Sequence, residues 1–436
     1  MAKYEQHTWT PRPDTIGLPR TARQGGTYSV YIPDKLANRA FLFGGAEAAD
    51  AADAERAILD LDRSATTLAD TEALARLLLR AESVASSHIE GLIVAPRRLL
   101  RADAARQHGD EPRDVTAAEV LANIDAMAYA IAAVNNGVPI TPELLRETHR
   151  HLLEPAALSE YAGQTRTQQN WIGGSSYNPF SAAFVPPPWE MVEPLLDDLC
   201  EFCNEDSLPS VAQAAIAHAQ FETIHPFVDG NGRVGRALIH LVFRRRKLTT
   251  AVSPPVSLIL ATRARDYIAG LSGTRYDGPP DSQQAVDGLN MWLGTFAAAC
   301  TRAAADATAF EQRIRKIQDG WRERLSSIRR HSITFRIIDV LPGTPIITLS
   351  EVQKLTGSSL SSAAEAMKKL ETAGIVAPLL AGRKRRQVYQ AREVVDAFAD
   401  LERQLASPAG DTRVEAPIRG VPCVVRSSPV LPGSSL

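Results

Sequence analysis

Residues 225–236, His-Pro-Phe-Val-Asp-Gly-Asn-Gly-Arg-Val-Gly-Arg, constrain the fold more than any other part of this sequence. Asp229 to Gly232 have the composition of a tight turn, and glycine lets such a turn direct its N–H groups toward one point. The apolar run over residues 237–243 predicts a helix, so the turn lies at a helix N-terminus. Free N–H groups and the helix dipole favour an anion there. We therefore predict helical structure around an anion-binding turn.

The charged side chains of this stretch suit a polyphosphate. Arg233 and Arg236 are three residues apart, so both can reach one anion from the first helical turn. Asp229 is a carboxylate beside that anion, and the two negative groups are compatible when Mg²⁺ lies between them. His225 can move a proton near neutral pH. Each feature alone is usually a plain turn or a solvated side chain, but together they predict a magnesium-polyphosphate site with a general base.

The stretch resembles the signature of the Fic family, His-x-Phe-x-Asp/Glu-Gly-Asn-Gly-Arg-x-x-Arg, at every fixed position. The resemblance implies an all-helical core that moves AMP from ATP onto a protein hydroxyl, with His225 as the base and Asp229 as the Mg²⁺ ligand. The catalytic residues that it implies are His225, Asn231, Arg233 and Arg236, and the nucleotide-binding residues are Phe227, Gly230, Asn231, Gly232, Arg233 and Arg236.

A second motif ends the helix that the apolar spacing predicts from Thr71 onward. Ser86 and Glu90 are four residues apart and share a helix face, and Gly91 is a typical C-terminal glycine. From the residues alone this is an ordinary helix end with an exposed acid. Many Fic proteins carry an inhibitory helix, Ser/Thr-x-x-x-Glu-Gly/Asn, and these three residues match it. The resemblance implies that Glu90 pairs with Arg236 and inhibits the enzyme.

Glycines and prolines interrupt the helical pattern between residues 159 and 188. They predict a hairpin with bends at these residues, and the simpler alternative is a long surface loop. In the Fic family a β-hairpin flap beside the active site docks the target by strand pairing. Gly163-Gln-Thr-Arg166 and Phe184-Val-Pro-Pro187 resemble its flanks, which makes residues 163–187 the implied flap. Strand pairing reads the backbone, so target specificity must come from elsewhere.

Apolar residues recur in steps of four and three from Phe310 to Ile328, after a separate helix expected over residues 284–302. This spacing predicts a long connecting helix with one apolar stripe. The stripe packs either on the core or on a second copy of the chain, so a homodimer is one of two alternatives.

Residues 333–397 resemble a winged helix. Three predicted helices within residues 335–373 precede two predicted strands, residues 374–378 and 387–390. The basic segment 382–386 between the strands is a candidate phosphate contact on DNA, and its alternative is a solvated tip of a fold used for protein contacts. The third helix offers serines rather than the arginines and asparagines that read base edges, which disfavours DNA binding.

The ends of the chain have a different composition. Prolines, glycines and polar residues over residues 1–35 predict an irregular arm. Helical spacing starts near Ala46, and Asp70 is the predicted N-cap of the next helix. Thr141-Pro142-Glu143 predicts a further helix start, with a capping threonine and a proline at the first position. Residues 406–436 are rich in Pro, Ser and Gly and predict disorder.

The chain of 436 residues is long enough for more than one domain. We expect the core and the winged helix to separate near residue 330. The expected regions are an N-terminal arm and helices including the inhibitory helix (1–110), a Fic catalytic core (111–300), a connecting helix (301–330), a winged helix (331–400) and a disordered tail (401–436).

Composition limits the cellular setting. The net charge of −2 gives no global sign of a nucleic-acid partner, and the four cysteines are scattered without a zinc pattern. No early apolar run follows a basic start, and no stretch approaches the roughly 20 apolar residues of a membrane helix. We expect a cytoplasmic protein without a membrane partner.

These observations predict a mainly α fold, with a Fic helical core, a short β-hairpin flap and a winged-helix domain. The function expected is protein adenylyltransferase, with ATP as substrate and Mg²⁺ as cofactor. The acceptor is a Tyr, Thr or Ser hydroxyl of an unidentified protein docked on residues 163–187, and self-modification is expected too. Two alternatives remain: a hydrolase that removes AMP, and a winged-helix transcription regulator with a nucleotide-sensing Fic core.

Overall fold

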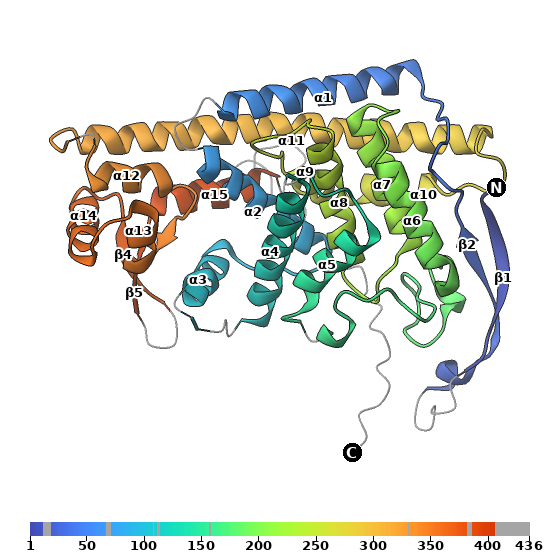
Figure 1. Ribbon diagram of the computed structural model, residues 1–436. Helices are drawn as coiled ribbons and strands as arrows, with labels where there is room; N and C mark the ends of the chain where they lie inside the picture. The colour runs from blue at the N-terminus through green and yellow to red at the C-terminus, as the bar shows by residue number, and fades with distance from the viewer. Residues whose placement is uncertain are drawn as a thin grey trace.

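The computed structural model describes residues 1–11, 19–66, 71–107, 109–110, 114–135, 137–156, 158–329, 331–381 and 386–405. Most of the chain is helical (Figure 1). The α-helices are α1 Gly45–Thr66, α2 Thr71–Ile89, α3 Pro96–Gln107, α4 Val115–Asn135, α5 Pro142–Leu153, α6 Val192–Cys203, α7 Ser210–Ile224, α8 Asn231–Arg245, α9 Val256–Thr262, α10 Ala264–Gly273, α11 Gln283–Arg324, α12 Ile333–Val340, α13 Leu349–Thr356, α14 Leu360–Thr372 and α15 Arg392–Leu405. The strands are β1 Lys3–Trp9, β2 Gly26–Ile32, β3 Ile346–Ile347, β4 Ala377–Ala381 and β5 Arg386–Gln390.

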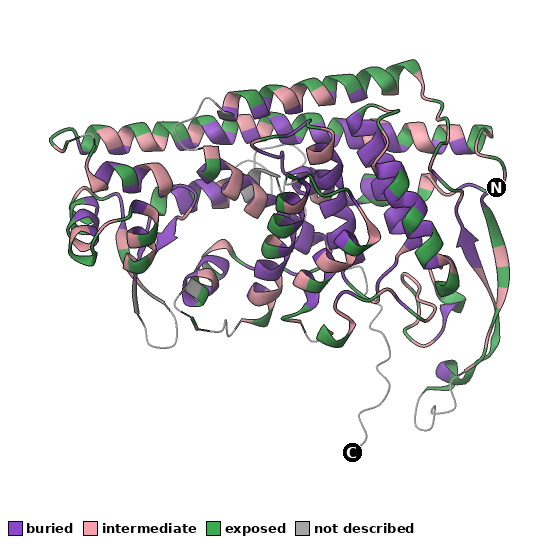
Figure 2. Cartoon of the chain, in the orientation of Figure 1, coloured by how far each residue is buried: buried purple, intermediate pink, exposed green. Residues whose placement is uncertain are grey.

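Helices α7 and α8 form the centre of the molecule. Every residue of α7 is buried, and the buried residues in Figure 2 concentrate on the helices in the middle of the molecule. Trp292 of α11 is fully buried, and its indole N–H donates to the carbonyl of Ala215 in α7 at 2.8 Å. The anion-binding turn thus joins the two helices that the rest of the fold covers.

The long helix α11 runs the length of the molecule beside α1 (Figure 1). The sequence predicted two helices here, one over residues 284–302 and one from Phe310, but the structure has one helix of 42 residues. The intervening residues are mostly alanines, which favour helix and give no reason to stop. The predicted boundary between residues 300 and 301 therefore falls inside a continuous helix.

The prediction of an irregular N-terminal arm is wrong. β1 and β2 form an antiparallel hairpin with Lys3 opposite Ile32 and Trp9 opposite Gly26. The prolines that suggested irregular structure lie outside both strands, at positions 11, 13, 19 and 33. On the other edge of β2, the Tyr31 N–H donates to the carbonyl of Val185 at 3.0 Å, so the hairpin is tied to the segment predicted as the flap.

The predicted β-hairpin flap is also not formed as a regular hairpin. Residues 158–188 contain short 3₁₀ turns and one antiparallel bridge, between Ile172 and Phe184. Gly173 and Gly174 have φ values of 73° and 74°, which suit a tight reversal rather than an extended strand. Pro186, Pro187 and Pro188 lack the N–H groups that a ladder needs.

The C-terminal unit contains the three helices α12, α13 and α14 and an antiparallel sheet in the order β3-β5-β4. β4 starts three residues later than predicted, and β3 and α15 were not predicted. The assignment as a winged helix stays a prediction. This unit packs on α3, where Leu100 and Ala104 share a buried cluster with Ile346, Val388 and Val395.

Three predictions fall outside the described residues. They are the N-cap at Asp70, residues 382–385 of the basic segment 382–386, and residues 406–436 of the predicted disordered tail. That tail was predicted from residue 401, but residues 401–405 belong to helix α15.

Helix α4 corrects the expectation that no stretch suits a membrane. It has 21 residues with a mean hydropathy of 1.4, enough by length and composition to cross a bilayer. Half of that stretch is buried inside the protein, where α4 packs against α2, α5 and α8. A buried core helix has the same composition, so this helix alone is weak support for a membrane span.

Candidate active site

The anion-binding turn has the predicted geometry. α7 ends at Ile224, His225 is left-handed with φ 49°, and Gly230 is left-handed with φ 76° immediately before α8 begins at Asn231. Asn231 is buried, its Oδ1 accepts from the N–H of Phe227 at 2.8 Å, and its Nδ2 donates to the Phe227 carbonyl at 2.9 Å. Asn231 therefore bonds to both backbone groups of Phe227 and stabilises the turn between them.

Arg166 holds His225 in its unusual backbone conformation. Its Nε donates to the carbonyl of His225 at 2.9 Å, and its Nη2 donates to the carbonyls of Pro187 at 2.6 Å and Ile224 at 3.3 Å. Burial lowers the pKa of Arg166 to about 10, so the side chain stays charged at neutral pH. From the sequence we predicted this arginine only as a flank of the flap, because backbone carbonyl acceptors leave no residue pattern.

The imidazole of His225 is electrically neutral near pH 7. Burial lowers its pKa to about 3, and the nearby charges of Arg166 and Arg275 act in the same direction. Its Nδ1 lies 4.0 Å from Oε2 of Glu222. A neutral imidazole has a free lone pair, so His225 is in the protonation state that a general base needs.

The side chain of Arg233 has the charge and the unpaired donors that suit an anion. Only 4% of its side chain is exposed, and its Nη2 lies 3.5 Å from Oδ2 of Asp229. Its Nε and Nη1 are buried and lack a hydrogen-bond partner within the described parts of the chain. A buried cation with unpaired donors is costly unless a ligand pairs with it, and a phosphate oxygen matches those donors.

Asp229, the Mg²⁺ ligand that the resemblance implies, lies at the anion-binding turn directly before Gly230. Half of its side chain, 51%, is exposed. The described residues include no cluster of three or more His, Cys, Asp or Glu that would hold a metal on their own. Mg²⁺ is commonly held by one or two carboxylates together with substrate phosphates and water, so this donor set fits that ion.

Helix α2 brings the predicted inhibitory motif onto Arg236, whose side chain is 1% exposed. Arg236 Nε donates to Ser86 Oγ at 2.9 Å, and Nη2 donates to the Ser86 carbonyl at 2.8 Å and to Glu90 Oε1 at 2.7 Å. Gly91 follows with φ 81° and ends the helix as predicted. A Cβ on Gly232 would overlap Oε1 of Glu90, so the carboxylate lies directly on the anion-binding turn.

A histidine that the sequence did not single out completes the turn. Thr141 caps α5 as predicted, accepting from the Leu144 N–H at 3.1 Å, and α5 carries His149 into the core. His149 Nε2 lies 3.0 Å from the carbonyl oxygen of Asp229. Its spacing on an apolar helix face is that of any core residue, so no sequence pattern marks it as part of the site.

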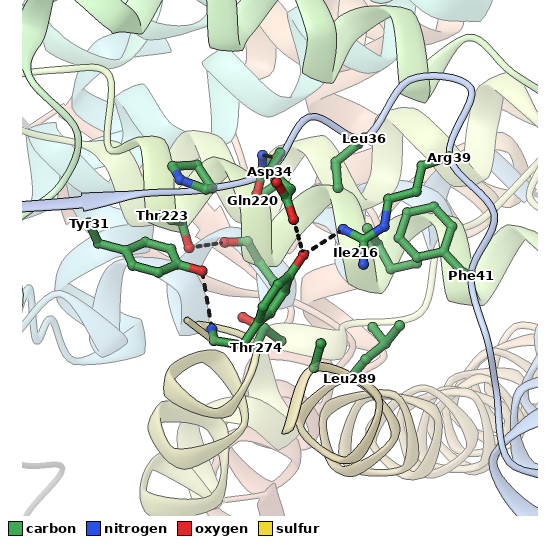
Figure 3. Close-up of a pocket in the computed structure, with 14 residues that line it drawn as sticks. Tyr31, Asp34, Leu36, Arg39, Phe41, Ile216, Gln220, Thr223, Thr274 and Leu289 are labelled. Atoms are coloured by element: carbon green, nitrogen blue, oxygen red, sulfur yellow. Dashed lines mark hydrogen bonds between the residues drawn. The ribbon is translucent and has the colours of Figure 1, made fainter. Parts of the chain in front are cut away.

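A separate cavity of about 50 Å³ lies beside α7, where Gln220 and Thr223 line it (Figure 3). Hydrogen bonds cross it: Tyr276 Oη donates to Asp34 Oδ2 at 2.6 Å, and Arg39 Nη1 donates to Tyr276 Oη at 3.0 Å. None of residues 225–236 lines this cavity. The cavity lies between α7, α11 and the segment that follows β2, and it is separate from the site described above.

Two family models match parts of this chain. Residues 139–243 match the Fic/DOC family, and residues 48–132 match the Fic/DOC family N-terminal region. Protein adenylyltransferase fic-1 of Caenorhabditis elegans is 36% identical over 124 residues, which are 28% of this chain and 22% of that protein. Protein adenylyltransferase Fic of Drosophila melanogaster is 31% identical over 152 residues, 34% of this chain and 28% of that protein. The chain thus matches less than a third of the length of these relatives.

Two solved structures are similar at low sequence identity. A Fic family protein from Desulfovibrio desulfuricans is 18% identical with a TM-score of 0.49, covering 80% of this chain and 97% of that one. Fic-1 from Caenorhabditis elegans is 23% identical with a TM-score of 0.45, covering 61% of this chain and 73% of that one.

Proposed function

Because the chain carries a Fic domain preceded by a Fic N-terminal region, we propose that it is a protein adenylyltransferase that transfers AMP from ATP to a hydroxyl group of a protein. The observation that carries the proposal is the pairing of a neutral His225 with an anion-binding turn that holds the unpaired donors of Arg233. A general base and a phosphate-binding turn that lie together suit the transfer of AMP to a hydroxyl group.

ATP would place its phosphates at the N-terminus of α8. The first N–H groups of that helix, its dipole and the free donors of Arg233 favour negative charge there. Mg²⁺ held by Asp229 and the phosphates would supply neutralising charge. Arg236 would reach the terminal phosphates only after it releases Glu90, because that contact occupies its Nη2.

His225 would accept the proton of a Tyr, Thr or Ser hydroxyl on the target. The hydroxyl oxygen then bonds to the α-phosphorus, the bond from that phosphorus to the oxygen bridging to the β-phosphorus breaks, and pyrophosphate leaves. A positioned base contributes roughly 10²–10⁴-fold to such a step. Arg166 supports it by holding the His225 backbone.

The target would dock beside residues 163–187, close to His225. Asn170 Nδ2 donates to the Phe227 carbonyl at 3.2 Å, so this segment lies directly against the signature stretch. With one bridge in place of a ladder, the docking surface is irregular, and side chains contribute more to target choice than strand pairing does. The apolar stripe that the sequence offered to a second copy packs instead in the core of this chain, where Phe310, Ile314 and Trp321 are buried, so α11 does not favour a homodimer. DNA binding by residues 333–397 remains a secondary proposal.

The test uses ATP labelled at the α-phosphate. Wild type and Glu90→Gly protein are incubated with labelled ATP and Mg²⁺, alone and with a cell lysate, and modified peptides are identified by mass spectrometry. We expect a mass increase of one AMP on Tyr, Thr or Ser, and none with His225→Ala in the Glu90→Gly background. Absence of AMP on any protein would refute transfer, and loss of AMP from a modified substrate would favour the hydrolase.

A further inference from the structure

His149 connects two parts of the site that are far apart in the sequence. Its ring is fully buried and stacks on Phe227, with centroids 3.8 Å apart and planes at 3°. The N–H of Gly163, at the base of the flap segment, donates to Nδ1 at 3.0 Å. Nε2 lies 3.0 Å from the carbonyl oxygen of Asp229. Because Nδ1 accepts a hydrogen, the ring proton of the neutral imidazole is on Nε2, which therefore donates to that carbonyl.

The contact to Asp229 fixes an N–H group of the anion-binding turn. The peptide between Asp229 and Gly230 is trans and planar, so its carbonyl and its N–H point in opposite directions. Holding the Asp229 carbonyl against His149 directs the Gly230 N–H away from the core. Gly230 also keeps a left-handed φ of 76°, and a Cβ there would meet Leu152 at 2.9 Å and His149 at 3.5 Å.

We propose that His149 is a positioning residue for AMP transfer, which orients the turn at residues 229–230 by donating Nε2–H to the Asp229 carbonyl. The inference rests on the proposed function, since the oriented turn is the one that would receive the phosphates of ATP. The two partners of the buried ring, the Gly163 N–H donor at Nδ1 and the Asp229 carbonyl acceptor at Nε2, fix its tautomer.

Two substitutions separate the two hydrogen bonds. Glutamine places its amide nitrogen near the position of Nε2, so His149→Gln keeps donation to the Asp229 carbonyl and loses the contact to Gly163. Asparagine places its oxygen near Nδ1, so His149→Asn keeps the contact to Gly163 and loses the donation. Both remove the same stack on Phe227, which makes each the control for the other.

The variants are compared in the Glu90→Gly background by ATP affinity, rate of AMP transfer and thermal unfolding. We expect similar unfolding temperatures, transfer by His149→Gln within about threefold of the parent, and a loss of roughly 10–100-fold in His149→Asn. Equal losses in the two variants, or an active His149→Asn, would overturn the inference while leaving the proposed function intact. A parent that neither binds ATP nor transfers AMP overturns the proposed function and this inference together.

A measurement on the unmodified protein covers the case in which both variants unfold. Nitrogen-15 spectra of the histidine rings report which nitrogen carries the proton. Between pH 6 and 8 we expect His149 to show a protonated Nε2 and an unprotonated Nδ1, and the opposite tautomer contradicts the proposed donation to Asp229.

Discussion

Oε1 of Glu82 lies 3.0 Å from Nε2 of His240, and both side chains are almost fully buried. Glu82 precedes Glu90 on α2 by two helical turns, while His240 follows Arg236 on α8 by one, so the two helices run antiparallel where they meet. The N–H of Ser257 donates to Oε2 of Glu82 at 2.8 Å, and its hydroxyl also bonds to that carboxylate. Helix α2 is therefore attached to its neighbours by a row of buried polar contacts and not by Glu90 alone.

Glu82→Ala should destabilise the protein strongly. It leaves the N–H and hydroxyl of Ser257 without their acceptor and leaves His240 facing a void, and removing one partner of a buried polar pair typically costs about 3–5 kcal/mol. Urea unfolding measures the loss. Glu72→Ala on the same helix is the control, because Glu72 is 81% exposed in its pair with Arg76 and should change the free energy of unfolding by under about 1 kcal/mol. Similar losses in both would show that the buried contacts contribute little.

Glu90→Gly should raise AMP transfer by a large factor. Each charge-assisted hydrogen bond to Arg236 is worth roughly 1.5–3 kcal/mol, so removing the carboxylate frees the arginine for the phosphates. Arg236→Ala should be slow, and the double variant should be no faster than Arg236→Ala, because the gain acts through that arginine. Initial rates of self-modification are compared for all four proteins. An unchanged rate in Glu90→Gly means that the helix is structural only.

Activity should require a divalent metal through Asp229. Asp229→Ala removes the carboxylate that would hold Mg²⁺ and should abolish transfer, with weaker magnesium-dependent ATP binding. Asp281→Ala, an exposed carboxylate ahead of α11, is the matched control and should behave as wild type. Transfer rates with Mg²⁺ and with excess EDTA measure the effect, and full activity in EDTA contradicts a role for the metal.

The buried carboxyl of Glu222 should make stability depend on pH. Burial raises its pKa from 4.5 to about 7, with Arg236 and Arg275 opposing the shift and Glu90 adding to it. A raised folded pKa means that the stabilising contribution is complete below pH 4.5 and is lost as the pH rises through about 7. Glutamine stays neutral at every pH. The free energy of unfolding of Glu222→Gln relative to wild type should therefore increase between pH 4.5 and about 7 and stay constant above that.

Urea unfolding of both proteins over a series of pH values measures this difference. The exposed Glu160→Gln is the control and should show no such gain. A difference between Glu222→Gln and wild type that does not change with pH would falsify the assignment of a raised pKa to this carboxyl.

A chain that ends near residue 330 should be less stable and less soluble than the full chain. The sequence led us to expect a separable core, but Leu100 of α3 packs in a buried cluster with Ile346, Val388 and Val395 of the removed part. Thermal unfolding and dye binding to exposed apolar surface test this. Leu100→Gln should improve solubility of the shortened chain and destabilise the full one. A shortened chain as stable as the full one supports the separable domains instead.

Several features followed from the sequence because they depend on neighbouring residues. The turn at residues 229–232, the helix start at Thr141 and the helix end at Gly91 each rest on local backbone chemistry, and the structure has all three. The pairing of Glu90 with Arg236 spans 146 residues, and only the family resemblance suggested it. The hydrogen bond of Ser86 to the same arginine was not predicted. The β1–β2 hairpin was missed because the prolines around it hid two short strands.

The tertiary structure alone decided which residues hold the site in shape. Arg166 and His149 act on the backbone carbonyls of His225 and Asp229, and every residue has a carbonyl, so the sequence cannot mark the partner. The flap departs from the expected hairpin for a local reason, since its glycines and prolines limit the pairing of residues 158–188 to one bridge, between Ile172 and Phe184. The sequence determined the chemical groups of this site and the turn that carries them, and packing of distant helices determined the direction in which those groups point.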